Sequence, residues 1–169
     1  MRFAALISPG GSVLDAACGH GRHARFLAAR GHPVLAVDRD EAALAALSAI
    51  AGIEVCRGDL EGERWPLPGR QFDALVVTHY LHRPRFADLL AALRPDGVLI
   101  YETFALGNAA FGKPSRPDFL LAPDELLQRA GALRIVAFEQ GHSAAPFPAV
   151  IQRICAVGAR RPWPFDLPA

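Results

Sequence analysis

The sequence predicts an α/β fold, in which a doubly wound, mostly parallel sheet of seven strands ends in an antiparallel hairpin. Two observations carry this prediction. Short apolar runs alternate with helical patterns along almost the whole chain, which is typical of parallel strands joined by crossover helices. The last two apolar runs are separated only by residues 140–149, where no helical pattern fits, and so short a connection suits antiparallel strands.

Seven apolar runs have the length and composition of buried strands. The run at 72–78, Phe-Asp-Ala-Leu-Val-Val-Thr, is rich in apolar and β-branched residues, as expected of a strand that is covered on both faces. In chain order, the predicted strands are 13–17, 33–37, 53–57, 72–78, 98–103, 133–139 and 150–157.

Four segments between these strands are predicted to be helical. Gly31 suits the end of the first helix, and Asp40 suits the N-cap of the second. Asp124 and Glu125 suit the first turn of the last helix. Residues 94–97, Arg-Pro-Asp-Gly, are predicted to form a turn. The predicted helices span 23–30, 41–50, 86–93 and 123–130.

Length and composition limit the possible functions. A chain of 169 residues suits one domain, 1–169, with a proline-rich tail at 160–169. The formal net charge of +1 provides no strong field for nucleic acid or anionic lipid, and no apolar run is long enough to span a membrane. Three widely separated cysteines do not form a disulfide framework. We therefore expect a cytoplasmic protein without membrane partners, and the low charge disfavours a nucleic-acid partner without excluding one.

The strongest motif is a predicted strand that runs into a glycine turn, Val-Leu-Asp-Ala-Ala-Cys-Gly-His-Gly at 13–21. Glycine at 19 and 21 allows a sharp turn and the close approach of a ligand. Asp38 follows Asp15 by about 20 residues, the offset at which an acid binds ribose hydroxyls in dinucleotide folds. Asp15 would repel a pyrophosphate but attract an ammonium group. The pattern therefore favours a ligand with an amino-acid end over a dinucleotide.

Polar residues follow the fourth and fifth predicted strands, where ligands bind in open α/β sheets. His79 and Tyr80 follow the fourth strand, and Glu102 lies near the end of the fifth. These three are the candidate catalytic residues, and His82 and Arg83 are further candidates. The long loop at 104–121 is either a lid over the site or a solvated connector. The spacing of Asp15, Cys18, His20 and His23 on a turning backbone predicts no metal site.

Five motifs in order resemble those of class I S-adenosylmethionine-dependent methyltransferases: Leu-Asp-Ala-Ala-Cys-Gly-His-Gly at 14–21, Val-Asp at 37–38, Gly-Asp-Leu at 58–60, 72–77 and 93–97. The resemblance covers about residues 11–157 and is greatest to bacterial members of the tellurite-resistance and small-molecule type. It implies a Rossmann-like fold, S-adenosylmethionine as cofactor and a small-molecule methyl acceptor.

The resemblance also assigns residues to the cofactor. Asp38 would bind the ribose hydroxyls and Asp59 the adenine amino group, although Asp59 also suits a turn cap. The residues assigned to the cofactor, from its methionine end to its adenine, are Asp15, Ala17, Gly19, Gly21, Thr78, Asp38, Arg39, Asp59 and Leu60.

Several questions stay open at this point. Members of the family usually carry helices before the first strand, whereas only residues 1–10 precede it here. Three explanations stay open: the acceptor pocket is open, it is completed by a second copy in a homodimer, or the true start of the chain lies upstream. A soft acceptor such as a thiolate or a metalloid oxyanion would need no general base, whereas a hydroxyl or amine would use His79 or Glu102. The alternatives to a small-molecule methyltransferase are a non-catalytic binding module and an RNA methyltransferase that works with a partner.

Overall fold

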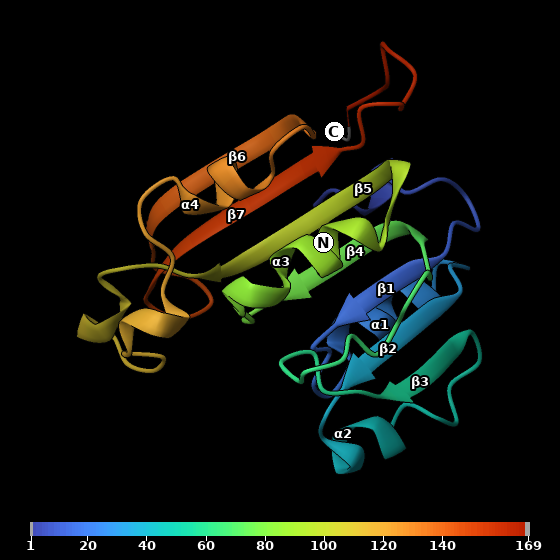
Figure 1. Cartoon of the computed structure of the whole chain (residues 1–169), viewed down its shortest axis with the longest axis horizontal. Coiled ribbons are helices and arrows are strands. Elements are labelled where there is room, and N and C mark those ends of the chain that lie inside the picture. Colours follow the sequence, from blue (N-terminus) through green and yellow to red (C-terminus); the bar gives the residue numbers. More distant parts are fainter. Residues whose placement is uncertain (1, 168–169) are drawn as a thin grey trace.

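The computed structural model describes residues 2–167 and contains a seven-stranded sheet in the order β3-β2-β1-β4-β5-β7-β6 (Figure 1). Strands β1 to β5 are parallel, and β7 is antiparallel to both β5 and β6. The predicted fold class is confirmed. The strands are β1 (Val13–Ala16), β2 (Val34–Asp38), β3 (Ile53–Arg57), β4 (Phe72–Thr78), β5 (Leu93–Phe104), β6 (Arg134–Ser143) and β7 (Ala149–Val157).

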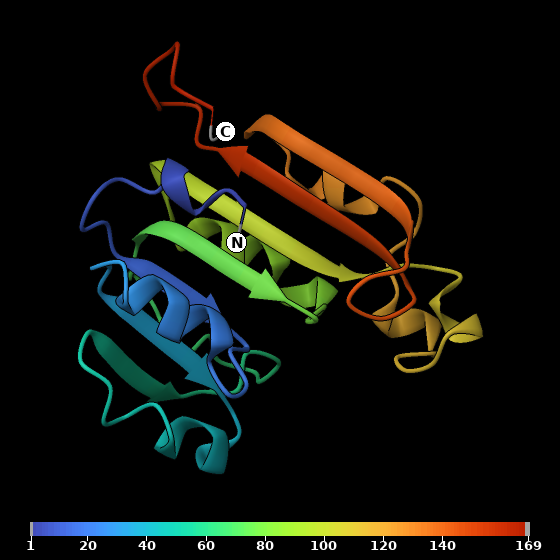
Figure 2. The same ribbon diagram turned by 180° about the vertical axis from the view of Figure 1, so that it is seen from behind.

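Short helices cover both faces of the sheet. Helices α3 and α4 lie over one face (Figure 1), and α1 lies over the other (Figure 2). The α-helices are α1 (Arg22–Ala28), α2 (Glu41–Ala45), α3 (Phe86–Ala91) and α4 (Glu125–Arg129). The 3-10 turns are η1 (Ala4–Leu6), η2 (Arg83–Arg85), η3 (Asn108–Ala110) and η4 (Pro117–Phe119).

The predicted helices are present but shorter than expected. Asp40 caps α2 as predicted, because its carboxylate accepts from the amides of Ala42 and Ala43. The helix ends at Ala45 rather than at Ile50, since the following turns use hydrogen bonds between residues three apart, such as Ile50 N–H to Leu47 C=O. Asp124 precedes α4 in a left-handed conformation instead of joining its first turn.

The turn predicted at 94–97 is wrong, because this segment belongs to the start of β5. The register between β4 and β5 is irregular here, which leaves the segment as an exposed bulge. Its carbonyl groups accept from a distant part of the chain: Gly158 N–H bonds to Gly97 and Arg160 N–H bonds to Pro95. These long-range bonds hold the segment in the sheet, and the local sequence gives no sign of them.

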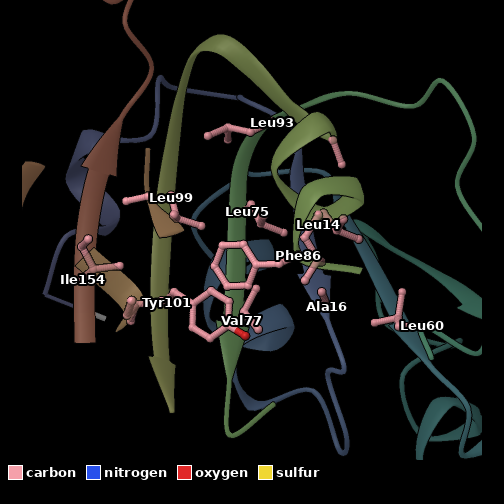
Figure 3. Close-up of a cluster of buried hydrophobic side chains, with 14 of the residues drawn as sticks. Leu14, Ala16, Leu60, Leu75, Val77, Phe86, Leu93, Leu99, Tyr101 and Ile154 are labelled. Atoms are coloured by element: carbon pink, nitrogen blue, oxygen red, sulfur yellow. The ribbon is translucent and has the colours of Figure 1, made fainter. Parts of the chain in front are cut away.

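The strands divide their side chains between two apolar cores. Leu14 and Ala16 of β1 point into the core under α3 and α4, where the rings of Phe86 and Tyr101 stack with centroids 5.5 Å apart (Figure 3). Val13 belongs to the core under α1. Asp15 alternates with Leu14 and Ala16, so it lies on the α1 side as a buried acid in an apolar layer.

The two ends of the described chain pack beside each other. Ala4, Leu6 and Ile7 are buried in the core under α1, and Phe165 packs against the same core. The Arg161 guanidinium donates to the Leu6 carbonyl at 2.7 Å. Of the predicted tail, Arg161 and Phe165 contact the body of the protein, Trp163 and Leu167 are exposed, and 168–169 lie outside the described residues. Within residues 2–167, no helix combines the length and apolar character that crossing a bilayer requires.

Candidate cofactor and acceptor site

The sheet order reverses between β1 and β4, and the carboxyl ends of these strands form one edge of the sheet. Open α/β sheets bind ligands at such a point. Three cavities lie along this edge. We name them the Asp38 cavity, the hairpin cavity and the large cavity, with volumes of about 260, 140 and 460 Å³.

The Asp38 cavity lies over the ends of β1, β2 and β3. Five of the residues predicted to bind the cofactor line it: Ala17, Asp38, Arg39, Asp59 and Leu60. The remaining lining residues are Gly58, Glu61, His79 and Tyr80. Because these come from separate loops, the predicted nucleoside-binding residues are brought together by the fold.

The carboxylate of Asp38 holds the glycine turn in place. Its Oδ2 accepts from the Gly19 amide at 2.8 Å, and its Oδ1 accepts from the Asp40 amide at 2.9 Å. Each carboxylate oxygen can accept a second hydrogen bond, so both keep capacity for ligand hydroxyls. Asp59 keeps a similar capacity, because its Oδ1 accepts from the Glu61 amide at 2.9 Å and its Oδ2 accepts no hydrogen bond from residues 2–167. Asp59 thus caps a turn and still presents an acceptor to the cavity.

The two glycines of the turn have different roles. Both have left-handed backbone angles, with φ of 53° at Gly19 and 70° at Gly21. A side chain at Gly19 would point into open space, as required for a ligand-facing position. A side chain at Gly21 would collide with Leu47, so Gly21 is needed for packing between α1 and the segment after α2. The prediction that Gly21 lies beside the ligand is not supported by this geometry.

Asp15 lies beneath the turn and lines none of the three cavities. It is 1% exposed, and its Oδ2 accepts from the Ala24 amide at 2.9 Å, which ties α1 to β1. Burial raises the pKa of Asp15 to about 7. Its carboxylate therefore supports the turn from below, rather than facing a ligand directly.

We expect Asp15→Asn to change the pH dependence of stability. Folded Asp15 holds its proton up to about pH 7 and unfolded Asp15 only up to about pH 4, so the free energy of unfolding falls as pH rises through this window. Asparagine can accept from Ala24 and cannot ionise, so the variant should be roughly 2 kcal/mol more stable at pH 8. Urea unfolding at pH 4 and pH 8 measures this. A variant less stable than wild type at pH 8 would contradict the prediction.

The hairpin cavity lies beside His79 at the ends of β4, β5 and β7. Its walls come from the start of α1, from β5 and β7, and from the connection between β6 and β7. The lining residues are Arg22, His79, Glu102, Phe104, Ser143, Ala145, Pro146, Phe147, Ala149, Ile151 and Arg153. Because His79 also lines the Asp38 cavity, the two cavities meet at this residue.

His79 and Glu102, two of the predicted catalytic residues, face each other in the hairpin cavity. Their Nε2 and Oε1 atoms are 4.0 Å apart, and the His79 ring lies against Phe104 with centroids 4.8 Å apart. Burial and the nearby Arg22 guanidinium lower the pKa of His79. At neutral pH the imidazole is therefore uncharged and able to accept a proton.

Tyr80, the third predicted catalytic residue, does not line the hairpin cavity. It lines the Asp38 cavity, and its carbonyl accepts from the Tyr101 hydroxyl at 2.7 Å. Its own hydroxyl is buried without a hydrogen-bond partner among residues 2–167, and burial raises its pKa. The structure thus separates Tyr80 from the His79 and Glu102 pair.

The large cavity opens on the α1 face of the sheet. It shares Arg22, Glu102 and Arg153 with the hairpin cavity, and Thr78 lines it from β4. Arg2 and Phe3 form one wall, where Arg2 pairs with Glu139 at 3.0 Å. The N-terminal segment therefore contributes to this cavity, which the sequence did not indicate.

The loop at 104–121 is anchored to the body of the protein at two places. Arg83 donates to Glu125 at 2.8 Å and to the carbonyls of Asp118 and Leu120, so this candidate residue has a structural role. Asn108 is buried, donates to Pro114 and accepts from Val150. Of the loop, only Phe104 lines the hairpin cavity, whereas the connection between β6 and β7 supplies the wall that we expected from this loop. His82 lines none of the three cavities.

Comparisons with known proteins agree with this architecture. The family model described as a methyltransferase domain matches residues 13–97. A sequence comparison with curated proteins gives no significant match.

Solved structures share the fold at low sequence identity. TehB from Haemophilus influenzae superposes with a TM-score of 0.76 at 19% identity, over 92% of this chain and 59% of that protein. This chain therefore spans less than two thirds of its length. A TehB-like S-adenosylmethionine-dependent methyltransferase from Corynebacterium glutamicum gives 0.66 at 22% identity, over 92% and 86% of the two chains. The Burkholderia thailandensis 1,6-didemethyltoxoflavin-N1-methyltransferase, with its acceptor and S-adenosylhomocysteine bound, gives 0.65 at 22% identity, over 92% and 76%.

Proposed function

The chain belongs to the class I methyltransferase family, and from this membership we propose that it transfers a methyl group from S-adenosylmethionine to a small molecule. The observation that carries the proposal is the pair of cavities that meet at His79. One has the carboxylates and glycine turn suited to a nucleoside, and the other has a neutral imidazole beside a carboxylate.

The residues of the Asp38 cavity fit the cofactor. The open space at Gly19 leaves room for a ligand against the backbone, and Asp38 and Asp59 keep acceptor capacity for ribose hydroxyls and the adenine amino group. Ala17, Arg39, Leu60 and Tyr80 complete the walls, while Thr78 lies toward the large cavity. When bound, the cofactor supplies an electrophilic methyl group on a sulfonium centre.

On the acceptor side, His79 would take the proton from a hydroxyl or amine at its Nε2. Once Nε2 is protonated, Glu102 would stabilise the imidazolium, since its Oε1 is 4.0 Å from this nitrogen. Phe104, Phe147 and Ile151 would keep water from the acceptor. The large cavity, with a volume of about 460 Å³, has the size of a small-molecule site. No specific observation favours a non-catalytic module or an RNA substrate.

The proposal is tested by binding first and turnover second. Calorimetry should show binding of S-adenosylhomocysteine, and incubation with methyl-labelled S-adenosylmethionine and a panel of phenols, amines, thiols and metalloid oxyanions should transfer label to at least one class. Binding of NADH in preference to S-adenosylhomocysteine would overturn the proposal.

Asp38→Ala should weaken S-adenosylhomocysteine binding by about tenfold or more, because two hydrogen bonds to a charged group and the brace on Gly19 are lost. Asp40→Ala is the matched control. Asp40 caps α2 and lines none of the cavities, so its loss should cost about 1 kcal/mol of stability and leave affinity unchanged. Calorimetry and thermal unfolding on both variants separate these outcomes. Equal affinities for the two variants would contradict the assignment of Asp38.

A further inference from the structure

The hairpin cavity has an apolar part that is separate from its charged residues. The three charged residues of this cavity, Arg22, Glu102 and Arg153, also line the large cavity, so they lie where the two cavities adjoin. The other wall residues supply rings, aliphatic groups and one hydroxyl: His79, Phe104, Ser143, Ala145, Pro146, Phe147, Ala149 and Ile151. A ligand in this part of the cavity would therefore contact mainly carbon.

Three aromatic rings form much of this apolar wall. The centroid of the His79 ring is 4.8 Å from that of Phe104 and 6.1 Å from that of Phe147, and the Phe147 ring is tilted by 63° from the imidazole plane. Phe104 is buried, whereas Phe147 is 46% exposed. Phe147 thus has ring surface that a ligand can cover, and a flat aromatic ligand would do so in the offset or edge-on contacts that aromatic pairs prefer.

The volume of the hairpin cavity suits one ring. It is about 140 Å³, and an apolar protein cavity of about 150 Å³ holds a benzene molecule. A second fused ring would have to extend past the charged residues toward the large cavity, where their guanidinium and carboxylate groups would lose water against an apolar surface. Size and polarity together favour a ligand with a single six-membered ring.

The base beside this cavity favours one kind of reacting group. Burial and Arg22 lower the pKa of His79, so its imidazole is a weak base that is neutral at pH 7. Such a base removes a proton far more easily from a phenol, which ionises at about pH 10, than from an alcohol, whose hydroxyl resembles that of water with a pKa of about 15.7. An aromatic amine can attack through its lone pair before it loses a proton, so it depends less on a base. A phenolic hydroxyl therefore makes the most use of His79.

We propose that the methyl acceptor is a phenol with a single aromatic ring, which lies against Phe104 and Phe147 with its hydroxyl at Nε2 of His79. This inference rests on the proposed function, because it places the hydroxyl where the hairpin cavity meets the Asp38 cavity. The phenol proton passes to Nε2 of His79 and then to water. The bond between oxygen and the methyl carbon forms as the bond between that carbon and sulfur breaks, so the products are an aryl methyl ether and S-adenosylhomocysteine.

Three ligands separate the aromatic ring from the acidity of the hydroxyl. Phenol has both, benzyl alcohol has the ring with an alcohol hydroxyl, and cyclohexanol has a six-membered ring that is not aromatic. On protein saturated with S-adenosylhomocysteine, calorimetry should show phenol and benzyl alcohol bound about tenfold more tightly than cyclohexanol. With methyl-labelled S-adenosylmethionine, kcat/KM for phenol should exceed that for either alcohol by about 100-fold or more, and benzyl alcohol should inhibit competitively against phenol.

Variants of Phe147 test the ring contact in the protein. Phe147→Leu keeps an apolar side chain without the ring, so KM for phenol should rise about fivefold or more, while kcat and the affinity for S-adenosylhomocysteine stay within about twofold. Phe147→Tyr keeps a ring and should retain the KM of wild type within about twofold. Phe111→Leu is the matched control, because Phe111 is 48% exposed, packs on His142 with centroids 4.8 Å apart and lines none of the three cavities. It should leave KM unchanged.

The outcomes separate this inference from the proposed function. If the protein binds S-adenosylhomocysteine but transfers label to cyclohexanol, aniline, a thiol or a metalloid oxyanion faster than to phenol, the acceptor class is wrong and the proposed function stands. Equal KM values for phenol in wild type and Phe147→Leu would also overturn the ring contact. If the protein does not bind S-adenosylhomocysteine, or transfers label to none of these acceptors, the proposed function fails and this inference fails with it.

Discussion

A Gly19→Val variant should fold and yet bind S-adenosylhomocysteine at least 100-fold more weakly than wild type. Apart from the adjoining residues of the chain, no described atom lies within 4 Å of a Cβ placed at Gly19, so the new side chain would occupy the space that the ligand needs. Valine at a φ of 53° also costs about 1–2 kcal/mol of backbone strain, a fraction of the ~5–15 kcal/mol that stabilises a typical domain. Circular dichroism checks the fold and calorimetry the affinity.

Gly31→Val separates the loss of ligand space from the backbone strain. Gly31 follows α1 with a φ of 83°, and a Cβ placed there also meets no described atom within 4 Å apart from the adjoining residues. Gly31 lines none of the three cavities. This control should lose a similar amount of stability and keep full affinity. If Gly19→Val also keeps full affinity, the turn does not face the ligand and the placement of the cofactor is wrong.

The bounds of strands could be predicted closely where the local sequence alone determines them. The strands at 53–57 and 72–78 have the predicted bounds, because each is a short apolar run between residues that cannot continue it. The terminal hairpin follows from the short connection before β7. The segment at 94–97 could not be predicted, because its place in β5 depends on bonds from residues 158 and 160.

The nucleoside half of the candidate site was also accessible from the sequence. Asp38 is the last residue of β2 and Asp59 lies two residues after β3, and the carboxyl ends of parallel strands meet at one edge of a sheet. In the acceptor half, His79 and Glu102 were predicted from the sequence, whereas the walls around them were not. Arg153 and Phe147 reach His79 only because β7 inserts beside β5, which brings the chain near residue 150 to a site that begins near residue 79. Two features of the sequence could have indicated these walls: the arginine directly after the glycine turn, and the aromatic residue in the connection between the last two strands.

Once an acceptor with an O–H or N–H group is found, His79→Asn should lower kcat about 100-fold or more, which is the range of a lost general base. Asparagine is the suitable replacement, because His79 has a φ of 55° and asparagine tolerates the left-handed conformation. Since His79 also lines the Asp38 cavity, the affinity for S-adenosylhomocysteine should be measured on the same sample. We expect it to change by only a few-fold.

The pH profile of kcat/KM shows whether the lower rate of His79→Asn comes from the loss of a general base. Burial and Arg22 lower the pKa of His79, so the uncharged form persists below pH 6.5 and the acid limb of kcat/KM should lie below that pH. Glu102 acts in the opposite direction and raises this pKa, so Glu102→Gln should shift the limb to still lower pH. In His79→Asn the limb due to this group should disappear, and the small remaining rate should be flat there. Full turnover in His79→Asn, with an unchanged acid limb, would show that the acceptor reacts without His79. A soft nucleophile such as a thiolate would behave in that way, because it carries no proton to remove.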